Sequence, residues 1–277
     1  MTTERLDPFV ASVFHPTDFS ESSKLAFAHA LAIALLRQTR LDILHAGEAS
    51  DLAWHGFPGV RKTLERWGLL EPGSERSAVF DELSVRVQKI QLTGDPTKVS
   101  LDYIAEKQPD LVVLATEGRD GPARWVRPSR AEAVVRHANT MTLAVPKGAR
   151  GFVRPEDGYL GLRRILVPIA RVPDPAAALV RAGRAAERLG DGPVEIEVLH
   201  VGDTPPGDVT LPAVEGCSWK QTLAQGDVVD EILRAASDAD LIVMAADGPD
   251  RVLDVFQGTT AERVLRGAEC PVLVVPA

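Results

Sequence analysis

Short apolar runs alternate with amphipathic stretches along the whole chain. The runs lie near residues 11–16, 41–46, 85–92, 110–115 and 141–146, and again near 164–169, 194–201, 217–224, 240–244 and 271–276. They are rich in Val, Leu and Ile, as parallel strands covered on both faces are. Between them, stretches such as residues 22–37 place apolar side chains at helical spacing. This alternation predicts an α/β fold with parallel, doubly wound sheets and right-handed crossovers.

The second half of the chain repeats the first. Residues 109–146 align without a gap on residues 239–276, so that Asp110 corresponds to Asp240. Earlier in the two copies, residues 44–45 match 199–200 at an offset of 155, and residues 94–95 match 226–227 at an offset of 132. Between these two matches, the first copy therefore holds 23 residues that the second copy lacks. A self-similar sequence of this kind predicts two structural copies of one unit.

The 23 additional residues contain a short helical pattern near residues 60–70 together with Trp54, Phe57 and Trp67. We interpret them as a helical excursion with a small hydrophobic core of its own. A surface that binds a partner is the alternative interpretation of these aromatic residues.

The repeat predicts two Rossmann-like domains in tandem. The first spans residues 1–147, with the extra helical segment at about 50–75, a linker spans 148–163, and the second domain spans 164–277. We expect the strand order 3-2-1-4-5 in each domain. The fifth strands are apolar and would be exposed at a sheet edge, so we expect them to pair with each other and form a pseudo-dimer within one chain. A further homodimer stays open.

Composition narrows the class of protein. The chain has 277 residues, of which 45% are hydrophobic and 25% charged, and its net charge is −8. This is the mix of a soluble globular protein, and the negative charge argues against nucleic acid as a partner. The polar N-terminus does not resemble a secretory signal, and the longest apolar run, residues 25–36, is too short for a bilayer. We expect a cytoplasmic protein without membrane contact, and its two cysteines indicate neither a metal site nor a disulfide framework.

A ligand of such a sheet lies beyond the carboxyl ends of the strands, where the strand order reverses. That places candidate chemistry in loops 16–21 and 115–128 of the first copy, and in loops 168–173 and 245–257 of the second. The longer loops end in the capping-box pattern S/T-x-x-E at 129–132 and 259–262. A helix N-terminus offers free N–H groups and a positive dipole end, which favour phosphate.

These motifs resemble the universal stress protein family. The resemblance rests on VFHPTDFSESS at residues 13–23, the Leu-His pair that ends the second strand, the Gly-Asp pair before a helix, and the loop that leads into S/T-x-A-E. It covers almost the whole chain, twice. It implies a stress-response or regulatory role and, in the members that bind nucleotides, ATP or AMP, with Mg²⁺ where the ligand is ATP. Those members carry the loop G-x2-G-x9-G-[S/T] and an aspartate at the end of strand one.

The second copy keeps the spacing of this loop. It has Ala245 at the first position, then Gly248, Gly258 and Thr259, followed by Thr260. Glycine is needed there because backbone N–H groups must approach phosphates closely, often with positive φ. In this copy, however, Ala170 stands where the nucleotide-binding members have an aspartate at the end of strand one. The resemblance implies that these five residues form the candidate nucleotide site.

The first copy has the opposite pattern. It keeps Asp18, Gly118 and Ser129, but Pro128 stands where the last glycine is expected. Proline has no N–H and cannot take positive φ, so a backbone cradle for phosphate is damaged. Asp18 has an alternative role as the cap or Asx turn that begins the first helix.

The sequence contains no catalytic constellation: GxSxG, GxxxxGK[ST] and HExxH are all missing. Any turnover, such as ATP hydrolysis, should be slow and incidental. His45 and His200 end equivalent strands and should be structural, whereas His15 lies beside the expected crevice. Two alternatives stay open: a nucleotide-free scaffold that binds protein partners, and a nucleotide hydrolase or transferase of a related fold.

Overall fold

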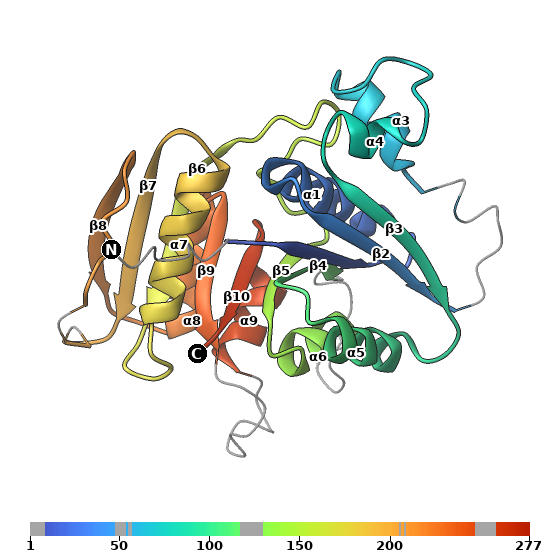
Figure 1. Cartoon of the computed structure of the whole chain (residues 1–277). Coiled ribbons are helices and arrows are strands. Elements are labelled where there is room, and N and C mark those ends of the chain that lie inside the picture. Colours follow the sequence, from blue (N-terminus) through green and yellow to red (C-terminus); the bar gives the residue numbers. More distant parts are fainter. Residues whose placement is uncertain are drawn as a thin grey trace, which may run out of the picture.

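The computed structural model describes residues 9–47, 54, 57–116, 130–204, 206–207, 209–246 and 259–277 (Figure 1). The N-terminal half contains β1 (Ser12–Pro16), α1 (Glu21–Arg37), β2 (Arg40–Ala46), α3 (Val60–Arg66), α4 (Ala78–Asp81), β3 (Arg86–Leu92), α5 (Pro96–Lys107), β4 (Leu111–Thr116), α6 (Arg130–His137) and β5 (Met141–Pro146). The C-terminal half contains β6 (Leu162–Ile169), α7 (Ala176–Leu189), β7 (Gly190–Val201), β8 (Cys217–Ala224), α8 (Val228–Ala235), a 3₁₀ turn (Ala236–Asp238), β9 (Leu241–Ala246), α9 (Thr260–Gly267) and β10 (Val272–Pro276).

All ten strands form one sheet in the order β3-β2-β1-β4-β5-β10-β9-β6-β7-β8. Within each half the strands are parallel and follow the predicted order 3-2-1-4-5. The halves meet where β5 pairs antiparallel with β10, with Leu143 opposite Leu273. The predicted pairing of the two fifth strands is therefore present, and it covers an edge of each five-stranded sheet. The domain boundaries at 147 and 164 stay a prediction.

Helices cover both faces of the sheet. Helices α1, α3 and α7 lie on one face, and α5, α6, α8 and α9 lie on the other (Figure 1). Successive strand residues alternate between the two cores, so Val13 faces α1 whereas Phe14 stacks on Tyr103 of α5. Because both faces are covered, the central strands are buried at almost every position, as parallel strands usually are.

Helix α1 is buried more completely than an amphipathic pattern requires. All residues from Ala26 to Ala34 are buried, including His29. Leu25 and Leu35, which the pattern places on the inner face, are only partly buried. The reason is that the segment between β5 and β6 lies over the outer side of α1, so that this helix is covered from both sides. A helix that is apolar nearly all round is one that is buried.

The repeat extends to polar side chains. Asp110, which precedes β4, accepts hydrogen bonds from Ala11 N and Ser12 Oγ at the start of β1. The corresponding Asp240, which precedes β9, accepts bonds from Arg163 N and Arg164 N in β6. In each half the aspartate therefore joins the same two strands at their amino ends.

The 23 additional residues contribute α3 to the N-terminal half, and α4 follows it. Between β7 and β8, the residues that the structure describes contain no helix. The helical excursion near residues 60–70 is therefore confirmed. Phe57 and Trp67 are both buried, as the mini-core interpretation requires. Phe57 packs near Phe19, whereas Trp67 contacts residues 155 and 158.

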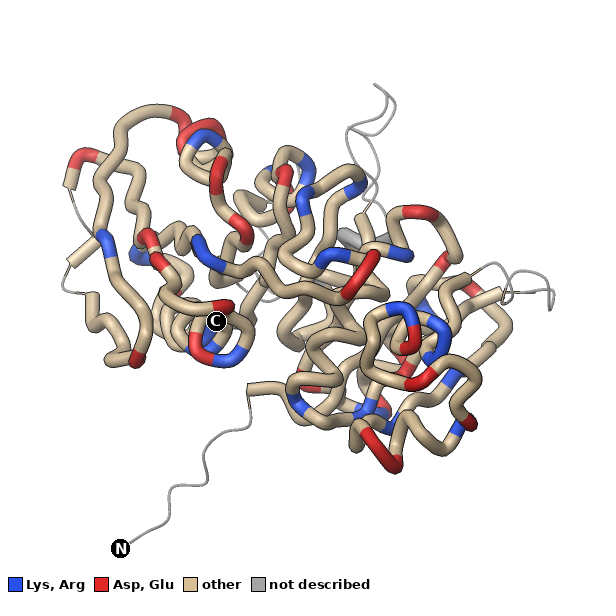
Figure 2. The backbone as a smooth tube through the Cα atoms, turned by 90° about the horizontal axis from the view of Figure 1, so that it is seen from above, with Lys and Arg blue, Asp and Glu red and all other residues tan. Residues whose placement is uncertain are grey.

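Charges of both signs are interspersed along both halves (Figure 2). Within the described residues, no helix is both long and apolar enough to cross a membrane.

Candidate functional site

In each half, two neighbouring strands separate at the place where the crevice is expected. Strands β1 and β4 pair only at two positions, ending at Phe14 and Val112, and beyond these residues they separate. Strands β6 and β9 do the same, and their pairing ends at Leu166 and Ile242. These are the points where the strand order reverses, which is where ligands of doubly wound sheets bind. Because β5 and β10 run antiparallel, the two crevices lie at opposite ends of the sheet.

His15 bridges the gap in the N-terminal half. Its Nδ1 lies 2.8 Å from Val113 O, one residue beyond the last strand pair, and the ring is fully buried between Phe27 and Phe57. Burial lowers the pKa of His15 to about 4, so the ring is neutral and its Nδ1–H donates to the carbonyl. Nε2 has no hydrogen-bond partner in the described structure. Val167 takes this position in the C-terminal half, where no side chain can bridge β6 and β9 in the same way.

Asp18 lies two residues before Ser20, the N-cap of helix α1. Its Oδ1 accepts hydrogen bonds from Ser20 N at 3.0 Å and from Ser23 Oγ at 2.7 Å, which is the Asx-turn role given above as an alternative. Burial works to raise the pKa of Asp18, but the bonds from Ser20 and Ser23 outweigh burial and hold the pKa below its usual value. The carboxylate is therefore ionised at neutral pH, and Oδ2 is the oxygen left for a ligand.

An aromatic cluster covers the carboxyl ends of β1 and β2. Phe19, in the left-handed region at φ 63°, stacks on His45 with 4.2 Å between the ring centroids. Trp54 packs edge-on against Phe19 at 4.9 Å, and Phe57 lies 5.4 Å away. His45 is oriented by a bond between its Nδ1 and Thr17 O. Phe57 and Trp67 lie in the same apolar core, with Trp54 packed against it, but the ring of Trp67 contacts Gly158 and Pro155 instead of these aromatic rings.

Two members of this cluster, Phe19 and His45, were not grouped with Trp54 by sequence reasoning. Their place in the sequence is the one feature that could have linked them: Phe19 follows β1 and His45 lies near the end of β2, at the same edge of the sheet. Parallel strands bring their carboxyl ends together, but the separation of residues 19 and 45 in the chain hides the contact.

The crevice in the C-terminal half has no such cluster within the described residues. His200 is held as His45 is, by a bond of 3.0 Å between its Nδ1 and Ile169 O, but no aromatic ring covers it in the part of the chain that the structure describes. Three exposed apolar side chains follow strands or begin a helix at this edge: Val172, Leu223 and Val228. Among the described residues, this edge therefore carries exposed aliphatic side chains in place of the aromatic cluster of its counterpart.

Helix α9 begins beside this second crevice. Thr259 Oγ1 accepts a bond from Glu262 N, and Glu262 Oε2 accepts one from Thr259 N, both at 3.2 Å. The predicted capping box is thus confirmed in this copy, and Glu262 is buried. The helix itself starts at Thr260, which is exposed. The cap takes the amide of Glu262, and the amides of Thr260 and Ala261 have no intrahelical acceptor.

The predicted site residues divide between the two crevices. Ala245, in β9, lies with Thr259 and Thr260 in the C-terminal half, whereas Asp18 lies at the other end of the sheet. The structure therefore does not bring Asp18 to the threonines. The remaining four predicted site residues lie outside the described residues: Gly118, Ser129, Gly248 and Gly258.

The described residues contain few groups that are suited to metal binding or to thiol chemistry. Among these residues, no group of three His, Cys, Asp or Glu side chains is arranged to hold a metal ion. Both cysteines are free, and burial raises the pKa of Cys270 to about 12, so that this thiol is not nucleophilic at neutral pH. Cys217, expected to be buried, is only half-buried because it lies in the edge strand β8.

Two doubly wound α/β units with reversed strand order at each crevice define a tandem Rossmann-like protein. The sequence pattern of the universal stress protein family matches residues 12–146 and 213–276, which is more than half of the chain. The chain belongs to the universal stress protein family.

Relatives of known sequence match about one half of the chain each. One universal stress protein of Methanocaldococcus jannaschii is 27% identical over 136 residues, covering 48% of this chain and 79% of its own length. A second one from the same organism is 20% identical over 152 residues, covering 49% of this chain and 94% of its own.

Solved structures match the whole chain. A universal stress protein of Archaeoglobus fulgidus DSM 4304 aligns with a TM-score of 0.64 at 20% identity, covering 97% of both chains. A protein of unknown function from Pseudomonas aeruginosa PAO1 aligns with a TM-score of 0.60 at 17% identity, covering 96% of this chain and 92% of its own. At these identities the likeness establishes the tandem fold alone.

Proposed function

We propose that this stress-response protein binds one adenine nucleotide, ATP or AMP, in the crevice of its C-terminal half. The observation that carries the proposal is the start of α9 beside the open ends of β6 and β9. Thr259 caps the helix, and the first-turn amides, with the hydroxyl of Thr260, are available to phosphate oxygens. The helix N-terminus and the glycine spacing before it, Gly248 and Gly258, support the same ligand class independently.

The C-terminal half is the better candidate for two physical reasons. In the N-terminal half, His15 bridges the separated strands and the rings of Phe19 and Trp54 cover the neighbouring strand ends. The loop of that half also ends in Pro128 where Gly258 stands in the other. Both features reduce the room and the number of backbone donors for a phosphate group.

The phosphates and the base of the nucleotide would lie at different places along this edge of the sheet. We place its phosphates at Thr259, Thr260 and the glycine-containing loop, and its base against the apolar edge near Val172 and Leu223. Mg²⁺ would accompany ATP and offset the negative charges that Asp250 and Asp254 bring to the loop. We propose binding and not turnover, since the sequence contains no catalytic constellation.

The test is mass spectrometry of the small molecules released from freshly purified protein, followed by calorimetry with ATP, with and without Mg²⁺, and with AMP. We expect close to one nucleotide per chain. Gly258→Pro should abolish binding because it removes an N–H and forbids positive φ.

Equivalent positions in the two copies supply a matched control. Gly248→Pro should weaken binding at least tenfold, whereas Gly118→Pro should leave it unchanged. The opposite result would move the site to the Asp18 side. A protein that is empty and does not respond to added nucleotide would contradict the proposal.

The alternative of a nucleotide-free scaffold has one observation in its favour. Ala170 stands at the end of β6 where nucleotide-binding members have an aspartate, and Asp18 in the other half is used by Ser20 and Ser23. A scaffold would bind a protein partner with unchanged affinity in the Gly258→Pro variant.

A further inference from the structure

The segment that joins the two halves is folded, and we call it the strap (residues 148–161). It turns back on itself through bonds from Arg154 N to Tyr159 O at 2.9 Å and from Gly161 N to Phe152 O at 2.7 Å, and Val153 forms a β-bridge with Leu160. Phe152 and Val153 are buried. A flexible tether would make few such bonds, so the strap has a defined shape that side chains elsewhere can hold.

Helix α1 holds the strap through His29. The Nδ1–H of His29 donates to Leu25 O at 2.8 Å, which leaves Nε2 as an acceptor for Val153 N at 3.3 Å. The ring of Phe152 packs edge-on against the imidazole at 4.6 Å. A methyl group on Gly151 would lie only 2.4 Å from the imidazole Cε1, so the strap backbone passes directly over this ring.

The segment around α3 holds the strap at a second point. Trp67 Nε1 and Arg66 Nη2 both donate to Pro155 O, each at 2.9 Å. The indole ring is buried, and its face lies against Gly158, where an added Cβ would come within 2.5 Å of the ring. The strap therefore packs against the end of α3, and we call the contact that Arg66 and Trp67 make with it the seat of the strap.

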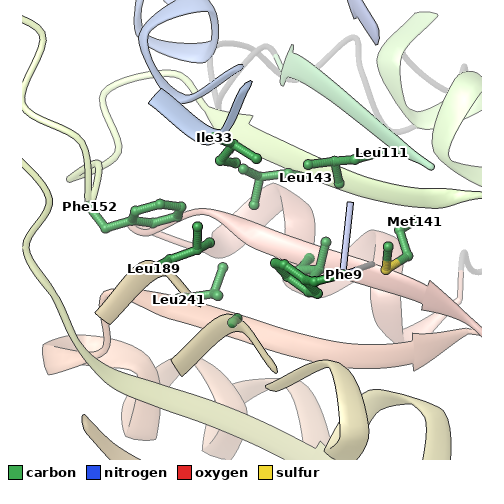
Figure 3. A pocket seen from close by; sticks show the side chains of 10 residues that line it. Phe9, Ile33, Leu111, Met141, Leu143, Phe152, Leu189 and Leu241 are labelled. Carbon is green, nitrogen blue, oxygen red and sulfur yellow. The ribbon is translucent and has the colours of Figure 1, made fainter. Parts of the chain in front are cut away.

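The strap also contacts the C-terminal half. Arg150 N donates to Glu269 O at 2.8 Å, and Tyr159 Oη donates to Asp191 at 2.7 Å. Phe152 reaches the seam between the halves, where it lines an apolar cavity of about 10 Å³ together with Ile33 and Leu143 on one side and Leu189 and Leu241 on the other (Figure 3). The cavity is lined by apolar side chains of both halves, so the seam is an apolar contact.

We propose that the strap is a latch that holds the two halves in their paired position, and that α3 with Trp67 is its seat. The antiparallel pairing of β5 and β10 comprises three residue pairs, and apolar side chains of both halves pack on each side of it. The strap adds contacts to both halves on the same face of this seam. The seat occurs in one copy only, and that copy is the one that precedes the strap in the chain.

The latch predicts that loosening the strap loosens the seam. Gly158 and Gly148 both lie in the strap at φ 74°, so an alanine meets the same backbone strain at each. Only Gly158 touches Trp67, whereas nothing lies within 4 Å of the Cβ position of Gly148. We expect Gly158→Ala to speed hydrogen exchange of the Val153 amide and of the amides in β5 and β10 at least tenfold over Gly148→Ala. Amides of β2 and β7 should not change.

A second pair of variants tests the same proposal in case Gly158→Ala prevents the strap from folding. Trp67→Phe removes an indole N–H that donates to Pro155, whereas Trp219→Phe removes one that has no partner in the described structure. We expect about three- to tenfold faster exchange at Val153 and at the seam for the first variant only. Equal exchange in both members of either pair would overturn the latch, and so would faster exchange in the strap with an unchanged seam.

Discussion

Four histidines share one local arrangement in this molecule. In His15, His29, His45 and His200, the Nδ1 atom lies within 3.0 Å of a backbone carbonyl oxygen. The bond fixes the orientation of each ring and, in the two fully buried ones, the neutral tautomer. The structural role predicted for His45 and His200 is confirmed by their equivalent bonds, to Thr17 O and Ile169 O.

The two buried histidines should make stability depend on pH. Burial lowers the pKa of both His15 and His29 from 6.5 to about 4. Between these values the unfolded chain binds protons that the folded chain does not, so stability decreases as pH falls. Each histidine should cost about 3 kcal/mol between pH 7 and pH 4.

Urea unfolding at a series of pH values tests this, with His29→Gln as the informative variant. Glutamine does not titrate, yet its amide oxygen can accept the Val153 N–H in place of Nε2. We expect the variant to lose roughly half of the pH dependence of the wild-type protein. An unchanged slope between pH 7 and pH 4 would contradict the assignment.

The capping box gives a second prediction at this scale. Thr259→Ala removes the acceptor for Glu262 N and should lower the free energy of unfolding by about 1 kcal/mol. Thr260→Ala changes an exposed neighbour of the same residue type and should change it by less than about 0.5 kcal/mol. Chemical denaturation of both variants, without nucleotide, separates the cap from the proposed role in phosphate binding.

Among the elements, the strands and most helices could be predicted because their patterns are local. Runs such as Leu111–Thr116 are recognisable by composition, and the helix starts at Asp95 and Asp227 by their capping side chains. The full burial of α1 could not be predicted, because the strap that covers its outer side lies more than a hundred residues further along the chain.

The bonds of Asp240 provide a test of how β6 is joined to β9. Its Oδ2 accepts from two backbone amides, at Arg163 and Arg164, each at 2.8 Å. Asp240→Ala leaves both donors without this partner and should cost about 1–3 kcal/mol in stability. Asp238→Ala removes an exposed ion pair with Arg164 and an exposed hydrogen bond from Ser237 Oγ, and it should cost less than about 1 kcal/mol. Thermal denaturation compares the two; equal losses would show that the paired bonds contribute nothing.

At the scale of the whole molecule, the seam decides whether the halves unfold as one unit. Leu273 of β10 is buried opposite Leu143 of β5 and lines the seam cavity. Leu273→Ala should cost about 2–5 kcal/mol, because it removes buried apolar atoms and enlarges an apolar cavity. Leu223→Ala, at an exposed position, should change stability by less than about 0.5 kcal/mol.

Calorimetry of the same two variants reports on coupling between the halves. If the seam joins them, Leu273→Ala should broaden or split the unfolding transition, and Leu223→Ala should leave its shape unchanged. A single sharp transition in both variants, displaced equally, would show that each half is stable without the seam.

The candidate site could be predicted only in part. The crevice followed from strand order, and the capping box at Thr259 from its local spacing. The grouping of Phe19 with His45 and Trp54, and the bridge from His15 to Val113, could not be predicted, because each joins residues that are distant in the chain. The role of Asp18 in nucleotide binding stays a prediction; the structure shows that its Oδ1 accepts bonds from Ser20 and Ser23 before α1.

The sequence by itself determined the repeat, the order of strands and helices, the parallel sheets and the family. These properties depend on composition and short-range spacing, which each copy carries within its own residues. Tertiary structure alone decided the contacts between distant residues: the bond from His15 to Val113 across the separated strands, and a strap held by Trp67 and His29. Such contacts depend on the shape and polarity of surfaces that meet only after the sheet has formed, and no local pattern along the chain records them.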